Sequence, residues 1–108
     1  MRRFIVSLVF ALVAATPALA ADGAIELRLR DHKFEPSEIH VAAEKPFVLH
    51  LINEDDTPEE FDSTMLGVEK VVPGSDDGLI RVTPLPAGLY QFMGEFHPNT
   101  AQGRVIVE

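Results

Sequence analysis

The sequence contains no cysteine and has few basic residues. Without cysteine the chain can form no disulfide, and no thiolate can serve as a metal ligand. Nine Lys and Arg residues stand against 17 Asp and Glu residues, so the formal net charge at pH 7 is −8. This acidity disfavours nucleic acid and anionic lipid as partners. It is compatible with the attraction of cations and equally with a surface that is acidic for solubility alone.

Residues 1–20 have the pattern of a secretory signal peptide. Arg2 and Arg3 precede the uncharged apolar run 4–15, which is short for a membrane span, and Ala18-Leu19-Ala20 fits the rule for cleavage after Ala20. We therefore expect a periplasmic protein that is exported by the Sec-type route. No later segment is long and apolar enough to cross a bilayer. Loss of the two arginines changes the net charge from −8 to −10.

The remaining residues, 21–108, predict one small all-β domain. Hydrophobic and polar residues alternate in short segments, and Pro and Gly mark the corners between them. The expected strands are 24–30, 38–41, 47–53, 79–83, 89–93 and 103–108. We expect a connection at 31–37, a short helical turn or irregular crossing at 64–70, and a loop at 75–78. The pattern indicates a small Greek-key β-sandwich of six or seven strands.

Two stretches carry side chains that suit metal ions. The first holds six acidic residues within nine positions, namely Glu54, Asp55, Asp56, Glu59, Glu60 and Asp62. By alternation, Glu60 and Asp62 share one face, and Glu59 points with Phe61 to the other. The second stretch follows the strand 89–93 and holds Glu95 and His97, which would share a face if the segment were extended. Imidazole combined with carboxylates suits Fe, Cu(II), Mn or Zn.

The arrangement of these motifs resembles the cupredoxin family over essentially the whole mature chain. The motifs are F-x-P-x-x-I-x-V at 34–41, a strand that ends in Asn53, and P-L-x-x-G-x-Y-x-F at 84–92. The resemblance places the family's copper-loop Cys at Gly94, its second His at His97, and its axial ligand at Gln102. The family's first His falls near Glu59. Because the thiolate is missing, we expect no blue-copper centre.

A narrower resemblance is to the EfeO-type cupredoxin-like domains. T-P-E-E-F-D-S at 57–63, Glu69-Lys70, and G-E-F-H-P-x-T-A-Q-G at 94–103 carry it. The group includes stand-alone subunits of the FtrB type. The resemblance implies a role in periplasmic iron uptake with iron or copper as the bound ion. It also implies a P19-like periplasmic iron-binding protein and an inner-membrane iron permease as partners.

If the two loops meet at one end of the sandwich, as they do in cupredoxins, the expected metal ligands are Glu60, Glu95 and His97. The alternates are Glu59, Asp62, Glu69 and Gln102. Glu69 is equally compatible with a salt bridge to Lys70. Met65 and Met93 are potential soft copper ligands, although core packing is the more common role of methionine.

Three functions remain open from the residues. In the first, the domain oxidises Fe(II) ahead of a permease. In the second, it is a non-catalytic chaperone for copper or iron, or a docking module. In the third, it is a metal-free structural module.

Overall fold

The computed structural model describes residues 23–108, so the predicted signal peptide at 1–20 lies outside the described residues. The described part holds nine strands and has no helix that could span a membrane. The strands are β1 (Ile25–Arg30), β2 (Lys33–Glu35), β3 (Glu38–Val41), β4 (Phe47–Asn53), β5 (Glu59–Ser63), β6 (Val68–Val72), β7 (Asp76–Val82), β8 (Gly88–Gly94) and β9 (Gln102–Val107).

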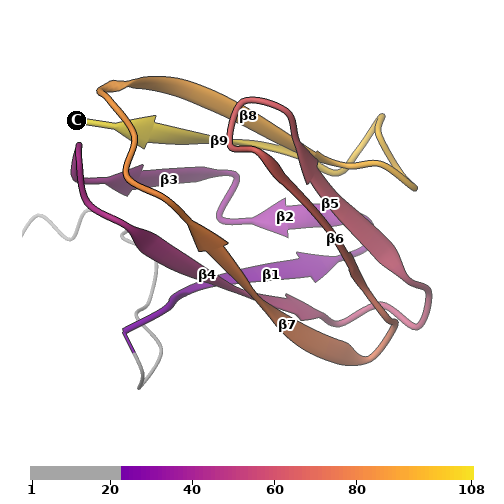
Figure 1. The fold of residues 1–108 in the computed structure, drawn as a ribbon. Coiled ribbons are helices and arrows are strands. Elements are labelled where there is room, and N and C mark those ends of the chain that lie inside the picture. Colours follow the sequence, from indigo (N-terminus) through magenta and orange to yellow (C-terminus); the bar gives the residue numbers. More distant parts are fainter. Residues whose placement is uncertain (1–22) are drawn as a thin grey trace, which may run out of the picture.

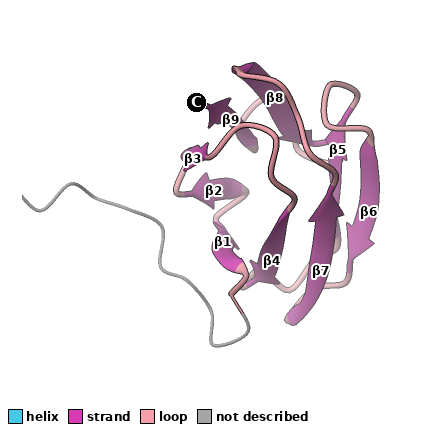
Figure 2. Cartoon of the chain, turned by 60° about the vertical axis from the view of Figure 1, so that its left-hand side comes forward, coloured by secondary structure: helices cyan, strands magenta, loops and turns pink. Residues whose placement is uncertain are grey.

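The strands form two sheets that pack face to face (Figures 1 and 2). One sheet has the order β2-β1-β4-β7, and the other has the order β3-β9-β8-β5-β6. The pairs β1–β4 and β3–β9 are parallel, and the other strand pairs are antiparallel. The fold is a sandwich of two β-sheets, so the all-β sandwich expected from the sequence is confirmed.

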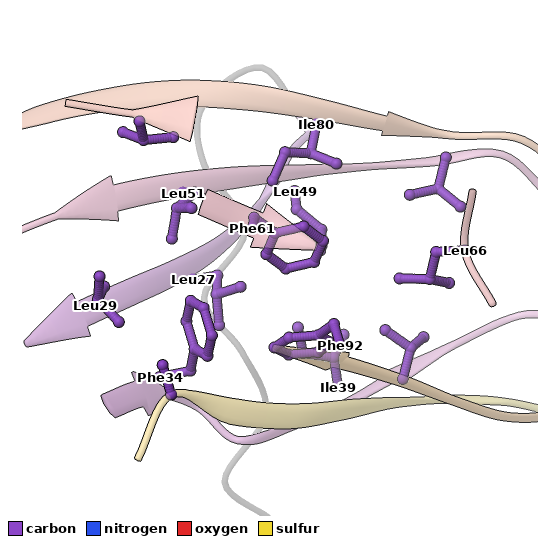
Figure 3. Packing of buried hydrophobic residues seen from close by; sticks show 14 of the residues in the cluster. Leu27, Leu29, Phe34, Ile39, Leu49, Leu51, Phe61, Leu66, Ile80 and Phe92 are labelled. Carbon is purple, nitrogen blue, oxygen red and sulfur yellow. The ribbon is translucent and has the colours of Figure 1, made fainter. Parts of the chain in front are cut away.

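The core between the sheets is built around three phenylalanines. Phe34, Phe61 and Phe92 come from β2, β5 and β8 and are each at most 4% exposed. The rings of Phe61 and Phe92 stack with centroids 4.9 Å apart, and the ring of Phe34 meets both edge-on. Figure 3 shows these rings beside the leucines of β1 and β4. This core holds the sandwich together without disulfides.

The strand predictions are correct where alternation is simple and fail where polar residues point inward. β3 and β4 have the predicted bounds. The acidic stretch, however, ends in strand β5, with Glu59, Phe61 and Ser63 buried and Glu60 and Asp62 half-buried. The expectation for 64–70 is wrong from Val68 onward, because only Thr64–Gly67 is a turn and β6 follows. The expected loop at 75–78 is mostly the start of β7.

Replacement of Phe61 by Ala tests the aromatic core. Phe61 is fully buried and packs against two other aromatic rings, so the cavity left behind should lower the free energy of unfolding by about 3–5 kcal/mol. Urea denaturation followed by circular dichroism measures this difference. The control is Leu89→Ala, at a side chain that is 44% exposed, with an expected change of about 0.5 kcal/mol or less. Equal losses in the two variants would contradict this account of the core.

Candidate metal centre

Three carboxylates meet on the outer face of the five-stranded sheet. Glu60 lies on β5, Glu69 on the neighbouring strand β6, and Glu95 directly after β8. The backbone N–H of Glu95 donates to the carbonyl of Glu60 at 2.8 Å, which extends the β5–β8 pairing to these two residues. One carboxylate oxygen from each of the three residues lies within 4.8 Å of the others. This acidic triad can offer three hard oxygen ligands to one cation.

The crowding of charge in the acidic triad raises the pKa of Glu60. The largest cause is the partial loss of water around its half-buried carboxyl group, and repulsion from Glu95 and Glu69 follows. A hydrogen bond to Glu95 and the nearby charge of Asp62 act in the same direction. A bound cation would reverse this effect, because a positive charge favours the ionised carboxylate. The triad is therefore electrostatically strained without a cation and relieved with one.

A second polar group lies at the same end of the sandwich, below the sheet surface. The side chain of Glu59 is fully buried, and its Oε2 lies 2.5 Å from Nδ1 of His97. Its Oε1 accepts from the backbone N–H of Phe96 at 2.9 Å and of Glu60 at 3.2 Å. A buried carboxylate is costly unless it is paired and hydrogen-bonded, and Glu59 is both. Its bonds join β5 to the loop that holds His97.

Glu59 also occupies the space that a side chain at position 94 would need. A Cβ atom added to Gly94 would lie 2.6 Å from Cδ of Glu59 and 2.7 Å from Cβ of Ala101. Both contacts are shorter than real Cβ atoms tolerate. A cysteine therefore cannot be placed at Gly94 while Glu59 keeps its position. A side chain at position 94 and the buried position of Glu59 therefore exclude each other.

The ring of His97 is covered by a second imidazole. His32 stacks on it with ring centroids 3.5 Å apart and an interplanar angle of 11°. The carboxylate of Asp55 holds the turn that carries His32, because it accepts from the N–H groups of Asp31 and His32 at 2.8 and 3.0 Å. No local pattern in the sequence indicates this contact, since His32 lies 65 positions before His97 in the chain.

The structure brings together Glu60 and Glu95, which are two of the three expected ligands. The third member of their group is Glu69, an alternate ligand in the sequence prediction, and not His97. The condition for Glu95 and His97 to share a face is not met, because 95–100 forms turns and a bend in place of an extended segment. His97 instead contacts Glu59 and His32.

The other alternates have separate places. Asp62 lies beside the triad, opposite Glu69 in the β5–β6 pairing. Gln102 donates from Nε2 to the carbonyl of Pro98 at 2.8 Å and so supports the loop. Within residues 23–108, Glu69 and Lys70 form no salt bridge of the kind that the sequence allowed.

Solved structures with the same fold include several copper proteins. An apo copper-binding protein superposes with a TM-score of 0.69 and 22% identity, covering 79% of this chain and 86% of that protein. The metal-binding domain of the Cu(I)-exporting P-type ATPase CopA of Streptococcus pneumoniae gives 0.69 and 16%, with coverage of 86% and 93%. A reduced amicyanin variant gives 0.60 and 27%, with coverage of 91% and 97%.

One relative by sequence is an uncharacterized protein of Rickettsia prowazekii (strain Madrid E). It is 40% identical over 83 residues, which are 77% of this chain and 66% of that protein. The match thus spans just under two thirds of the relative's length. The family model for the cupredoxin-like domain matches residues 3–107. With the sandwich topology, this match establishes that the chain belongs to the family of cupredoxin-like domains.

Proposed function

We propose that this chain is a periplasmic metal-binding protein of an iron-uptake system and that it holds a hard cation on the acidic triad. The observation that carries the proposal is the convergence of ligand oxygens from Glu60, Glu69 and Glu95 within 4.8 Å. Carboxylate oxygens suit hard cations, whereas a copper electron carrier of the blue type needs a thiolate. Iron in its Fe(III) state is the hard ion that an uptake system would carry.

We propose His97, which lies outside the group of three convergent carboxylates, as an additional nitrogen ligand from the loop after β8. Its Nδ1 pairs with Glu59, which leaves Nε2 as the ring nitrogen for a metal ion. Histidines that bind metals commonly donate their other ring N–H to a carboxylate, which fixes the tautomer and orients the ring. Glu59 has this relation to His97. In this proposal Glu59 therefore positions His97 and is not itself a ligand.

The narrower resemblance to EfeO-type domains supports iron as the cargo. The protein would receive iron in the periplasm and pass it to an iron permease, with a periplasmic iron-binding protein as a further partner. Export by the predicted signal peptide agrees with this location. A carrier of this kind needs an open site, and Glu69 and Glu95 are both exposed.

Oxidation of Fe(II) is the second candidate function, and the hard ligand set favours it. Three carboxylates stabilise Fe(III) more than Fe(II), so a bound Fe(II) ion would lose an electron more easily. The electron would pass to dioxygen, and the product Fe(III) would stay on the same oxygens. Copper(II) is the alternative occupant, because imidazole and carboxylate together also suit that ion.

Substitution of the acidic triad tests cation binding. Glu60→Gln and Glu95→Gln should each weaken binding of Mn(II), and of Fe(II) under nitrogen, by at least about tenfold, because each removes a charged ligand. Isothermal titration calorimetry measures the affinity. The matched control is Asp56→Asn, which removes one exposed carboxylate of the same acidic stretch outside the triad. Loss of affinity in the control equal to that in the triad variants would reject the site.

The raised pKa of Glu60 makes a prediction for the metal-free protein. An acid whose folded-state pKa is raised stabilises the fold below its unfolded pKa, near 4.5, and this contribution is lost as pH rises through the folded value. Glu60→Gln removes the repulsion. It should therefore make the metal-free protein more stable than wild type in urea at pH 7, with the gain disappearing below about pH 4. A destabilised variant at pH 7 would contradict the account.

The rate of Fe(II) loss in air separates an oxidase from a carrier. An oxidase should accelerate the loss over buffer, followed with a ferrous-specific chelator, and His97→Ala and Glu95→Gln should reduce that rate. A carrier should bind the iron without acceleration. The assay is run with and without one equivalent of Cu(II), since copper is the alternative occupant. No acceleration in either condition would exclude the oxidase function and leave the carrier.

A further inference from the structure

Two methionines lie on the protein surface. Met65 is 52% exposed and Met93 is 41% exposed, although methionine is usually a core residue. The expectation that they pack in the core is therefore wrong. Because the chain has no cysteine, these thioethers are the only soft metal ligands among residues 23–108.

Both side chains line one hollow on the outer face of the five-stranded sheet. The hollow has a volume of about 600 Å³ and lies over β5, β8 and β9. Met93 belongs to β8, where it stands between Asp62 on β5 and Gln102 on β9 in the strand pairing. Met65 belongs to the turn Thr64–Gly67 that follows β5. Figure 1 shows how β5, β8 and β9 lie side by side in this sheet.

The turn that carries Met65 is fixed against the strand that carries Met93. The hydroxyl of Ser63 donates to the carbonyl of Gln91 at 2.6 Å and accepts from the N–H of Leu66 at 3.0 Å. These bonds hold the turn over β8, two residues before Met93. The methionine side chain has three rotatable bonds, so the two thioethers can adjust around a common ion while the backbone stays in place.

The charges around the hollow favour a cation. Its one cationic side chain, Arg104, is already neutralised, because Nε and Nη2 both donate to Oε2 of Glu38 at 3.0 and 2.7 Å. Asp62 lies next to Met93 and forms no such ion pair with any residue of the described range 23–108. The hollow therefore combines two soft sulfur donors, the carboxylate of Asp62 and the amide of Gln102, while its second carboxylate, Glu38, pairs with Arg104.

From this arrangement we propose that Met65 and Met93 bind Cu(I) in the hollow. Thioethers are soft ligands that select Cu(I) over hard divalent ions, and the charge of Asp62 adds attraction for the ion. The site is separate from the acidic triad, which offers only hard oxygen ligands. The two sites share the same sheet, since Asp62 lies between Met93 on one side and Glu69 on the other. The protein would then carry a soft and a hard cation on adjacent sites.

The methyl groups of the methionines give a direct measurement. Protein purified from the exported fraction is labelled with carbon-13 at the methionine methyl groups and titrated with Ag(I), which mimics Cu(I) and is stable in air. The resonances of Met65 and Met93, assigned with single Met→Leu variants, should shift together and reach their end points at one equivalent. Shifts of only one resonance, or of neither, would reject the shared site.

Affinity for Cu(I) itself is measured by competition with a chromogenic Cu(I) chelator. Met65→Leu with Met93→Leu conserves volume at two exposed positions, so the fold should be unchanged, and affinity should fall by at least about tenfold. Glu60→Gln with Glu95→Gln is the matched control and should leave Cu(I) affinity unchanged while it weakens Mn(II) binding. Unchanged Cu(I) affinity in the Leu variant would overturn the proposal, whatever the outcome at the acidic triad.

Discussion

The buried carboxylate of Glu59 is the constraint on which this end of the sandwich depends. It is fully enclosed, and its oxygens accept hydrogen bonds from the backbone of Glu60 and Phe96 and pair with His97. A charge in this position cannot be left unpaired without a large loss of stability. The loop after β8 must therefore fold back over β5. That fold places Glu95 against Glu60 on the outer face, and so creates the acidic triad.

The same carboxylate limits which side chain can stand at position 94. Glu59 fills the space that a side chain at Gly94 would need, and Gly94 is the position at which the resemblance to cupredoxins places the copper-loop cysteine. The core beneath is built on the stacked rings of Phe61 and Phe92. The sandwich and the family match place the chain among the cupredoxin-like domains, but a shared fold does not by itself identify the ion that a member binds. Function must be argued from the site.

Much of the fold follows from the sequence, because one buried face produces alternation that is easy to detect. β4 is predicted to the residue, with Leu49 and Leu51 inward. β5 escapes detection because its inward residues include Glu59 and Ser63, which a hydropathy pattern assigns to water. Each is buried only because a distant segment supplies its partner, the loop at His97 or the carbonyl of Gln91. Long-range hydrogen bonds of this kind leave no local periodic signal.

The candidate site shows the same division between local and long-range information. The face shared by Glu60 and Asp62 is a local property of a strand, and the sequence predicts it correctly. The spacing of Glu95 and His97 is equally short, but turns replace the extended backbone that the prediction assumes. The side chain of Glu95 therefore lies on the sheet surface, and that of His97 lies against the buried carboxylate of Glu59. The spacing of two residues predicts that their side chains share a face only where the backbone conformation is known. Backbone conformation is least regular in loops, and loops are the segments that commonly carry binding residues.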